Sequence, residues 1–511
     1  MVTFAKTTLP TIYNVNKRKI LLILAATMAL AIQGTQAQHL LKTSYEANGL
    51  YGSGNYAPFW HIANRQGVSS TERASAYTRL GIEGTNIFNS SNITLQWGAD
   101  AVVAHNLAST LFLQQAYFDF KWRRVNISLG QKERWGGYPN HRISTGALVE
   151  SGNARPIPQI RVELPEYWNI PGTKGWLAIR GHIAYGCFTD DSWQKEFFHK
   201  DAIRTENVLY HSKSGFMRIG NKETFPLTAE IGLYMTTQFG GSYYNSNDEI
   251  GSHYSNPTRL KDFFYALIPM GGDASYSACD QTNVAGNMLG SWNGAITWSA
   301  KEWTLRAYYD HTFEDQSQMF WEYGLWTEQL AGIELKLKNF KWISNVLFEY
   351  FNLKNQSGPI YNDTNALFPD QISCKDNNYN HGLYAGWFNY GQMIATPLCT
   401  GPIYNTDREQ ICYNNRVEAF HFGIEGEPLK WLGYRALYTR SNNWGTYKHP
   451  FKEIKTNRSL LAELTFSPSF MKDWSITTSF ALDTGKLYGN NYGGMITIKG
   501  YNIFNLKKEK K

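Results

Sequence analysis

Beyond residue 37 the chain has no run of 18 or more apolar residues, so it lacks a transmembrane helix of ordinary length. Charged residues are also scarce, at 18% of 511 positions. The mean hydropathy of −0.42 is nevertheless too polar for a helical membrane protein. A chain of this length can hold several soluble domains or one very large closed sheet, and these two options remain.

Motifs of catalysis and metal binding are missing as well. The chain has no G-x-S-x-G elbow, no G-x-x-x-x-G-K-[ST] loop, no H-E-x-x-H motif and no metal-ligand spacing. Asp190 and Asp191 are adjacent, so on a strand they would point to opposite faces, whereas glycoside hydrolysis needs two facing carboxylates. Asn140, His141 and Ser144 are the one set of residues close together in the sequence that resembles a hydrolase triad. The sequence therefore predicts no catalytic residue, no metal and no cofactor.

Cysteine is rare, and its count of five is odd. Cys399 and Cys412 bracket a short segment and Cys374 is nearby, so a loop disulfide is an option in an oxidising compartment. At least one thiol stays unpaired in any arrangement, and the spacing assigns no pairing.

Aromatic residues and glycine, by contrast, are plentiful. The chain has 32 Tyr, 28 Phe, 17 Trp and 44 Gly, and aromatics make up 15% of it. A composition rich in aromatics and glycine but only moderately apolar is typical of membrane β-barrels, because only half of each strand faces lipid.

The stretch SGNARPIPQIRVELP (Ser151–Pro165) shows the pattern that recurs along the chain. Ile160, Val162 and Leu164 alternate with Arg161 and Glu163, which predicts a strand with one apolar and one charged face. The prolines suit strand ends, where no hydrogen-bond donor is needed. About 18 segments alternate in this way, near residues 43–51, 73–84, 92–101, 116–122, 125–129, 160–164, 177–183, 208–219, 225–239, 292–300, 302–312, 330–338, 341–352, 416–426, 429–440, 457–467, 474–480 and 494–504.

These segments favour an all-β fold, a transmembrane antiparallel β-barrel of about 18 strands. Many have the length that crosses a bilayer when strands are tilted. Short turns join some, and longer stretches near 132–158, 187–207, 240–290 and 353–415 separate others, as in barrels with long loops at one end only. The alternative is a large soluble β-protein, such as a propeller or paired sandwiches. No blade-length repeat supports it, and aromatic residues near many strand ends favour the barrel.

Residues 1–37 have the features of a secretory signal peptide. Lys17, Arg18 and Lys19 precede the short apolar core Ile20–Ile32, and Thr35-Gln36-Ala37 resembles a cleavage site. We expect residues 38–511 to form the exported barrel, with long extracellular loops near 240–290 and 353–415 that partly fill its mouth. Removing the four basic residues of the signal lowers the net charge of +7 to about +3, which does not favour a nucleic-acid partner.

Three stretches resemble the Wzi family of capsule-assembly proteins. They are SGNARPIPQIRVELP, DHTFEDQSQMFWEYGLW (Asp310–Trp326) and NNYNHGLYAGWFNYGQMIATPL (Asn377–Leu398), and the resemblance covers about residues 40–500. It implies an 18-stranded outer-membrane barrel that acts as a surface lectin, helps organise exported capsular polysaccharide and carries out no known chemistry. A periplasmic helical bundle, as a family member carries, is not expected, because strand-like sequence begins at Thr43–Tyr51.

Candidate site residues form two groups. Sugar binding generally uses aromatic faces beside amide and charged groups, and the 353–415 loop and the Arg134–Arg142 segment have this mixture; the same residues could equally pack on one another and close the barrel mouth. The candidates for binding carbohydrate are Asn377, Asn378, Tyr379, His381, Tyr384, Trp387, Tyr390, Trp135 and Tyr138. A second group would line the lumen as a charge ladder that braces it, or would guide an acidic polysaccharide or ions: Arg155, Arg161, Glu163, Arg180, Glu314, Asp315 and Glu322.

The sequence thus predicts a non-enzymatic, lectin-like barrel of the bacterial outer membrane, with capsular or other surface polysaccharide and outer-membrane lipid as partners. We expect a monomer. The alternatives are a diffusion porin for small polar or charged solutes and, from a third class, a membrane-embedded hydrolase that would depend on Ser144.

Overall fold

The computed structural model describes residues 38–88, 91–245, 253–277, 280–281, 284–314, 316–319, 327–356 and 375–505. The predicted signal peptide, residues 1–37, lies outside them. So do two members of the predicted charge ladder, Asp315 and Glu322.

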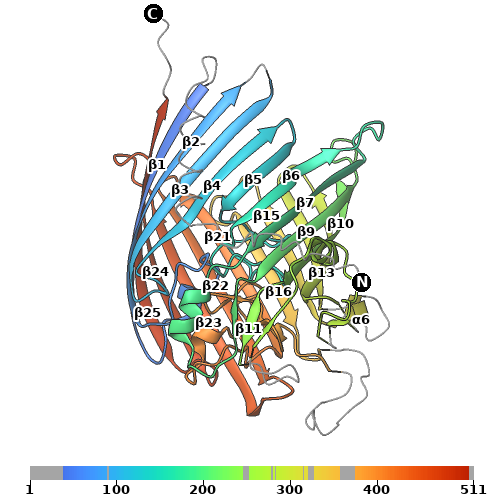
Figure 1. The fold of residues 1–511 in the computed structure, drawn as a ribbon. Helices are drawn as coiled ribbons and strands as arrows, with labels where there is room; N and C mark the ends of the chain where they lie inside the picture. The colour runs from blue at the N-terminus through green and yellow to red at the C-terminus, as the bar shows by residue number, and fades with distance from the viewer. Residues whose placement is uncertain are drawn as a thin grey trace, which may run out of the picture.

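Eighteen strands form one closed antiparallel sheet, which confirms the predicted barrel. Each strand pairs with its neighbours in chain order, and β1 closes the ring by pairing with β25, so the first and last strands lie side by side (Figure 1). Each alternating segment of the sequence overlaps a different strand. The strands are β1 (Gln38–Ser53), β2 (Ala74–Phe88), β3 (Ile93–His105), β4 (Leu111–Trp122), β5 (Val125–Gln131), β6 (Gln159–Asn169), β7 (Leu177–Cys187), β9 (Leu209–Ile219), β10 (Leu227–Phe239), β13 (Asn287–Ser299), β14 (Trp303–Phe313), β15 (Gln329–Leu337), β16 (Asn345–Asn352), β21 (Val417–Leu429), β22 (Leu432–Gly445), β23 (Pro450–Phe466), β24 (Trp474–Gly485) and β25 (Asn491–Asn505).

The outer wall is apolar because alternate residues of each strand point away from the lumen. In β6 the side chains of Ile160 and Val162 point outward and are exposed, while Arg161 and Glu163 point inward. Outward-facing apolar side chains occur all around the ring, among them Leu80, Ile82, Ile127, Leu129, Ile183, Ile231, Ile296, Ile333, Phe348, Phe422, Leu460, Leu464, Phe480, Ile496 and Ile498.

The two ends of the barrel differ. At the end we call the turn end, short turns such as 123–124 and 430–431 join the strands, and the described chain both enters and leaves there, at Gln38 and Asn505. At the loop end, long connections span 54–73, 132–158, 188–208, 240–286, 314–328 and 353–416. In outer-membrane barrels the short turns are periplasmic and the long loops extracellular.

Exposed aromatic side chains surround the turn end, as expected where a barrel wall meets the membrane–water interface. They are Trp122, Trp176, Phe225, Trp298, Trp303, Phe340, Trp342, Trp431 and Phe466. Within the described part of the chain, no helix is long and apolar enough to cross a membrane.

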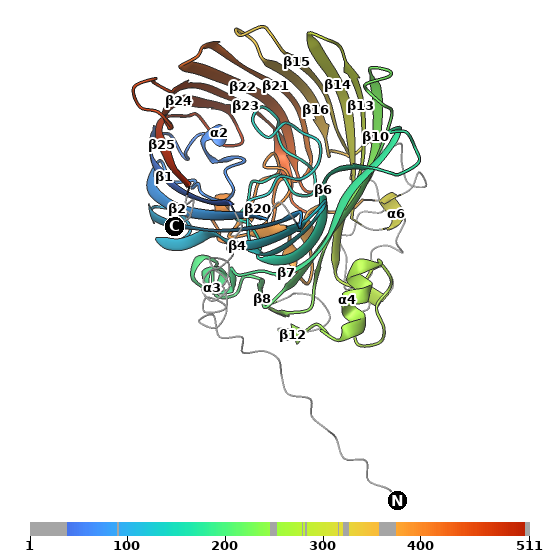
Figure 2. The same ribbon diagram turned by 90° about the horizontal axis from the view of Figure 1, so that it is seen from above.

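The connections between strands at the loop end contain short elements that alternation did not predict. Among them are the helices α2 (Phe59–Ile62), α3 (Asp191–Phe197), α4 (Leu260–Leu267) and α6 (Gln316–Met319), and the small sheet of β8 (Arg204–Glu206), β11 (Ser242–Tyr244) and β12 (His253–Ser255). Seen along the barrel, α2 and β20 (Gln392–Met393) lie inside the ring of strands, whereas α4 lies outside it (Figure 2).

Candidate functional site

The 132–158 loop crosses the lumen from wall to wall. Its Arg134 donates from Nη2 to Ser128 Oγ on β5 at 2.8 Å, and its Asn140 donates from Nδ2 to Glu334 Oε1 on β15, also at 2.8 Å. Arg142 forms an ion pair of 2.6 Å with Glu425 on β21. These strands lie on different sides of the ring, so the loop is held across the barrel interior.

A buried carboxylate of the wall and a carboxylate of the loop itself hold the middle of this loop. Glu349 on β16 accepts both the backbone N–H and the hydroxyl of Thr145 at 2.8 Å. In the opposite sense, the loop's own Glu150 accepts the hydroxyls of Tyr210 on β9 and Tyr234 on β10. A typical hydrogen bond contributes roughly 0.5–1.5 kcal/mol to stability, so these four bonds together hold the loop in place.

The 353–416 loop packs on the first one. Asn153 donates from Nδ2 to Met393 O at 2.9 Å, and Tyr379 donates its hydroxyl to Leu148 O at 3.0 Å. Its Asn389 donates to the backbone carbonyl of Arg155 at 2.8 Å. The two loops therefore form one packed unit within the lumen.

The 54–73 loop, which no sequence pattern marked as part of a site, completes this unit. The N–H of Phe59 in α2 donates to Asp483 on β24 at 2.9 Å, and Gln66 donates to the carbonyl of Arg134 at the same distance. Phe59 and Trp60 join a buried apolar cluster with residues of the other two loops, such as Leu148 and Trp387. We call the described parts of the three loops, 54–73, 132–158 and 353–416, the plug.

Most of the predicted carbohydrate-binding residues lie inside the plug. Asn378, Tyr379, Tyr384 and Trp387 are at most 2% exposed, and Tyr138 is 6% exposed, so in this conformation their faces are covered by protein. They pack against other side chains of the protein, which the composition equally allowed.

The other predicted carbohydrate-binding residues are more accessible. Trp135 is 40% exposed and stacks on His141, with ring centroids 4.8 Å apart, beside the lumenal contacts of Arg134. Asn377, His381 and Tyr390 are partly exposed. The structure therefore places Trp135 within the lumen and Tyr390 near α3.

Aromatic side chains gather where α3 meets Tyr390 at the loop end. Trp193 stacks on Phe197 with ring centroids 4.6 Å apart and contacts the ring of Tyr390 at 6.0 Å. All three rings are partly exposed. The Arg408 guanidinium lies over Phe197 at 5.6 Å. We call Trp193, Phe197 and Tyr390 the loop-end aromatic patch; of these, sequence reasoning singled out only Tyr390.

Exposed charged side chains surround the loop-end aromatic patch. Lys195, Glu196 and Arg408 are exposed, and His199 bonds to Glu409 at 2.5 Å. Aromatic faces beside charged and amide groups are the combination that sugar rings and their hydroxyls need. The loop-end aromatic patch has both features.

The predicted charge ladder is only partly assembled on the lumenal wall. Arg161 and Glu163, two residues apart along β6, form an ion pair of 2.6 Å. The guanidinium of Arg180 lies 4.5 Å from the ring centroid of Phe216. Arg155 lies within the plug, and Glu314 accepts the backbone N–H of Tyr379. Further lumenal ion pairs were not predicted: Arg306–Glu334, Arg435–Glu463, Lys132–Asp119 and Lys499–Glu46.

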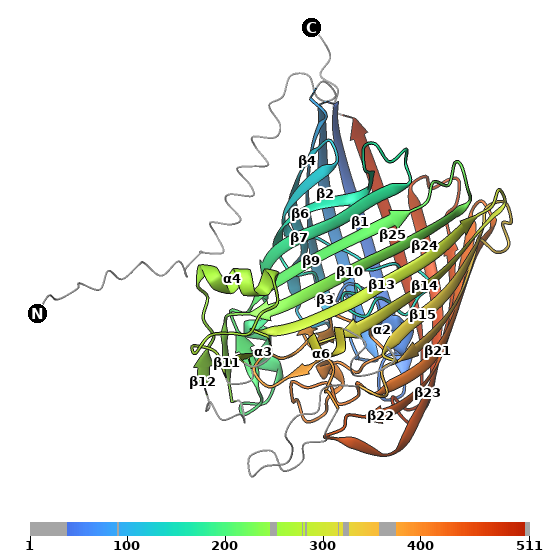
Figure 3. The ribbon, with the colours of Figure 1, turned by 90° about the vertical axis from the view of Figure 1, so that its right-hand side faces the viewer.

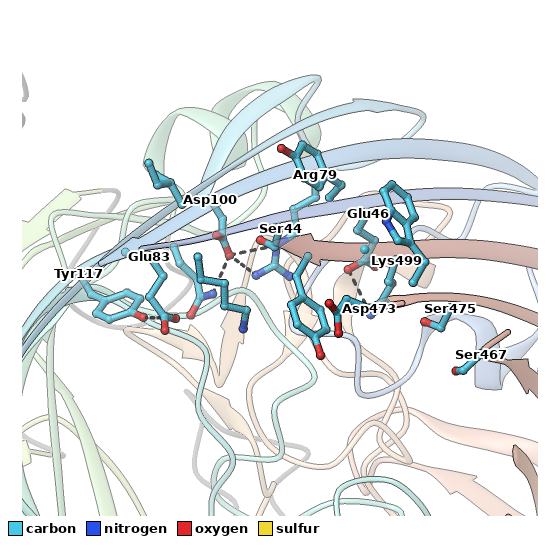
Figure 4. A pocket seen from close by; sticks show the side chains of 18 residues that line it. Ser44, Glu46, Arg79, Glu83, Asp100, Tyr117, Ser467, Asp473, Ser475 and Lys499 are labelled. Carbon is cyan, nitrogen blue, oxygen red and sulfur yellow. Dashed lines mark hydrogen bonds and ion pairs between the residues drawn. The ribbon is translucent and has the colours of Figure 1, made fainter. Parts of the chain in front are cut away.

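A polar cavity of about 600 Å³ opens inside the wall of β1–β4 and β24–β25. Its lining includes Ser467 and Asp473 from a turn-end connection, so it lies at the periplasmic side (Figure 4). Glu46 pairs with Lys499 at 3.1 Å, and Arg79 pairs with Asp100 and, at 2.9 Å, with Glu133 of the plug. We call this cavity the vestibule; its charges are largely neutralised by one another.

Residues with hydrolase potential do not form a catalytic arrangement in the described structure. Ser144 is buried and accepts the N–H of Gly146 at 3.3 Å, while His141 stacks on Trp135. A nucleophile needs a base within hydrogen-bond reach, and no hydrogen bond among the described residues joins His141 to Ser144.

The two adjacent acids at α3 each accept a backbone N–H group. Asp190 accepts the N–H of Tyr390 at 3.0 Å, and Asp191 accepts that of Asn207, also at 3.0 Å. Burial raises the pKa of Asp190 to about 6.

Among the described residues no group of three His, Cys, Asp or Glu side chains could hold a metal ion, and Cys187, Cys399 and Cys412 are free. Cys279 and Cys374 lie outside the described residues.

Comparison with solved structures identifies the fold. The structure of Wzi, described as an outer-membrane protein of Escherichia coli involved in group 1 capsule assembly and as a carbohydrate-binding β-barrel, matches with a TM-score of 0.53 and 12% identity. The match covers 93% of this chain and 86% of that one. OprD of Pseudomonas aeruginosa matches with a TM-score of 0.47 and 9% identity, over 92% and 98% of the two chains. The sequence matches no protein-family model and no curated protein. The fold is that of a bacterial outer-membrane β-barrel.

Proposed function

We propose that this protein binds surface polysaccharide at its loop end and helps attach or order a capsule, without catalysing a reaction. The observation that carries the proposal is the plug. Its hydrogen bonds and ion pairs reach strands on different sides of the ring, at Ser128, Glu334 and Glu425. A barrel whose interior is occupied by fixed loops is suited to presenting a surface rather than to passing solutes.

The loop-end aromatic patch is the proposed contact with the polysaccharide. Trp193, Phe197 and Tyr390 expose parts of their rings, and the Arg408 guanidinium and Glu409 carboxylate lie beside them. Sugar C–H faces stack on aromatic rings, and charged groups bond the hydroxyls, so the patch has both parts of a saccharide site.

The likeness to Escherichia coli Wzi supports this proposal. That protein is described as a carbohydrate-binding β-barrel, and it shares the overall fold at 12% identity. The resemblance of the Ser151–Pro165 and Asn377–Leu398 stretches to the same family points in the same direction.

A diffusion porin is the second candidate, and the vestibule favours it. This cavity of about 600 Å³ is polar, charged and located at the turn end, as the entrance of a channel would be. The plug argues against a through-path, since Glu133 of the 132–158 loop reaches Arg79 in the wall of the vestibule.

The test of the proposal compares cell-bound and shed polysaccharide. The gene is deleted and restored with the intact chain, with the Trp193→Ala/Phe197→Ala variant, or with the Lys448→Ala variant, which changes an exposed residue of the short 446–449 connection at the same end of the barrel. We expect shedding in the deletion strain and in the double variant, and retention with the intact chain and Lys448→Ala.

Correct assembly of each variant is checked by the mobility shift that folded barrels show between unheated and heated samples. Equal retention in all strains would contradict the capsule proposal. If the double variant retains polysaccharide and the deletion strain does not, the binding site lies outside the loop-end aromatic patch.

A further inference from the structure

Helix α4 lies against the outer face of the barrel wall. Tyr185 donates its hydroxyl to the carbonyl of Phe263 at 2.8 Å, and the Phe263 ring packs on Tyr185 and on Phe239, with centroids 5.4 and 5.1 Å away. Tyr185 follows the exposed Ile183 by two residues in β7, so both side chains point away from the lumen. Figure 3 shows α4 beside the strands on the outside, well short of the loop end of the molecule.

Lys213 of β9 fixes the end of this helix to the wall. It lies on the outward face, in step with the exposed Met217, where a cation in lipid would be costly. Its ammonium group donates to the carbonyl of Ala266 at 2.9 Å and to that of Leu267 at 2.5 Å. A lysine at a helix C-terminus satisfies the free carbonyls and interacts favourably with the helix dipole. Lys213 therefore anchors the C-terminal end of α4 to the barrel wall.

The opposite side of α4 carries an exposed apolar stripe. Leu260 and Phe264 are 82% and 61% exposed and lie four residues apart in the helix, and Ile268, which directly follows its last residue, is 55% exposed. Residues at this spacing lie on one face of a helix. Asp262 and Ala266, on the side turned away from this stripe, are buried. The stripe thus points away from the protein.

We infer that α4 is an interfacial helix whose stripe of Leu260, Phe264 and Ile268 inserts into the acyl chains of the outer leaflet. The stripe belongs to a surface that is already exposed to lipid. On the strands that carry α4, the outward residues nearer the turn end are apolar and exposed: Ile183, Met217 and Ile231. A helix with one apolar face lies in the membrane interface with that face buried in the acyl boundary.

A second copy of the chain is less suited than lipid to cover the apolar stripe of α4. A stable protein interface buries roughly 800 Å² on each partner. The apolar stripe of a single eight-residue helix is too small for that area. Lipid needs no minimum area, and it surrounds the barrel wall on which α4 rests.

Site-specific photo-crosslinking tests the inference in the full-length, folded barrel. A photoreactive benzoylphenylalanine replaces Phe264, or Leu260, in separate preparations reconstituted into phosphatidylcholine vesicles. The control carries the same probe in place of Glu196, an exposed residue of α3 at the loop end. After irradiation, mass spectrometry identifies what is attached to each probe.

We expect phosphatidylcholine adducts at positions 264 and 260 and none at position 196. A chain-to-chain adduct at 264 in place of lipid would overturn the inference in favour of a second copy. Equal lipid labelling at all three positions, or none at 264, would also overturn it. None of these outcomes depends on whether the loop end binds polysaccharide.

A paired variant measures what the stripe contributes. Leu260→Asn/Phe264→Asn keeps the contacts of Phe263 and Lys213 but removes the apolar stripe. We expect faster trypsin cleavage at Lys261 in vesicles than in the intact chain, while both chains should be cleaved at the same rate in detergent-free urea, where the barrel is unfolded. Equal rates in vesicles would show that lipid does not hold this helix.

Discussion

The guanidinium carbon of Arg155 lies 3.8 Å from the ring centroid of Tyr390. The two residues belong to different loops of the plug, and the same guanidinium carbon lies 3.9 Å from the ring centroid of Phe112 on β4. Arg155 is only 4% exposed, so the stack is shielded from water. It ties both loops to the wall directly behind the loop-end aromatic patch.

Replacing Arg155 should loosen the plug locally. A desolvated cation–π contact contributes about 2 kcal/mol, which corresponds to roughly thirty-fold faster opening. In the Arg155→Ala variant we therefore expect amide hydrogen exchange around Tyr390 to accelerate by that order, with partial recovery in Arg155→Lys. Arg408→Ala, which removes an exposed guanidinium, is the control and should change little. Unchanged exchange in Arg155→Ala would show that the stack is not an anchor.

Period-2 alternation predicted every strand of the barrel because it depends on local side-chain direction and on lipid outside. Ile160, Arg161, Val162 and Glu163 occupy the faces that their alternation implies. The same local pattern says little about loops. The aromatic and amide residues around Trp387 suit sugar stacking and core packing equally well, and only the long-range contacts of the plug show that they are buried.

Other features depended on contacts between distant segments. Arg155 was predicted to line the lumen, but it lies between Phe112 and Tyr390, which no local spacing brings together. Helix α2 has four residues and is too short to show helical periodicity. For α4, the decisive fact is that Lys213 and Tyr185 point out of the barrel toward it, and this becomes visible only when the strand register is known.

The two faces of the wall should respond in opposite ways to an added charge. Val162 is 47% exposed on the outer face, and arginine near the bilayer midplane costs about 2–4 kcal/mol. We expect Val162→Arg to lower the free energy of unfolding from phosphatidylcholine vesicles in urea by this amount. Ser475→Arg, in the wet vestibule, should change it far less. Similar losses in both variants would contradict the assignment of faces.

The plug should loosen as the pH falls. Burial lowers the pKa of His381 to about 4, and its Nδ1 accepts the N–H groups of Leu383 and Tyr384 at 3.1 and 3.4 Å. The opened loop, with an ordinary histidine pKa near 6.5, binds more protons between these two values. The stability contributed by neutral His381 is thus present above about pH 6.5 and is lost as the pH falls toward 4.

Hydrogen exchange around Tyr384 at pH 7 and pH 4.5, corrected for intrinsic rates, measures this loss. We expect protection to decrease at the lower pH in the intact chain and to depend less on pH in His381→Asn. His253→Asn, which changes an exposed histidine in β12, should behave like the intact chain. An equal pH response in all three proteins would assign the effect to other groups.

Removing the 132–158 loop should open the lumen to ions. This loop holds contacts with Ser128, Glu334 and Glu425 on different sides of the ring, and the other two loops of the plug pack on it. A Gly/Ser linker in place of residues 134–154 leaves the strands intact but removes these bonds. In planar bilayers we expect little single-channel current from the intact chain and a clear increase from this variant.

The matched control replaces residues 106–110, a short connection at the same end, with the same type of linker. It should conduct no more than the intact chain, and heat-dependent mobility shifts must show that all three barrels are folded. An intact chain that already conducts as well as the variant would mean that the plug leaves a water-filled path. In that case the vestibule would be the mouth of a channel, and the porin candidate would replace the polysaccharide-binding one, since the charged lumenal pairs such as Arg161–Glu163 would then line a solute route.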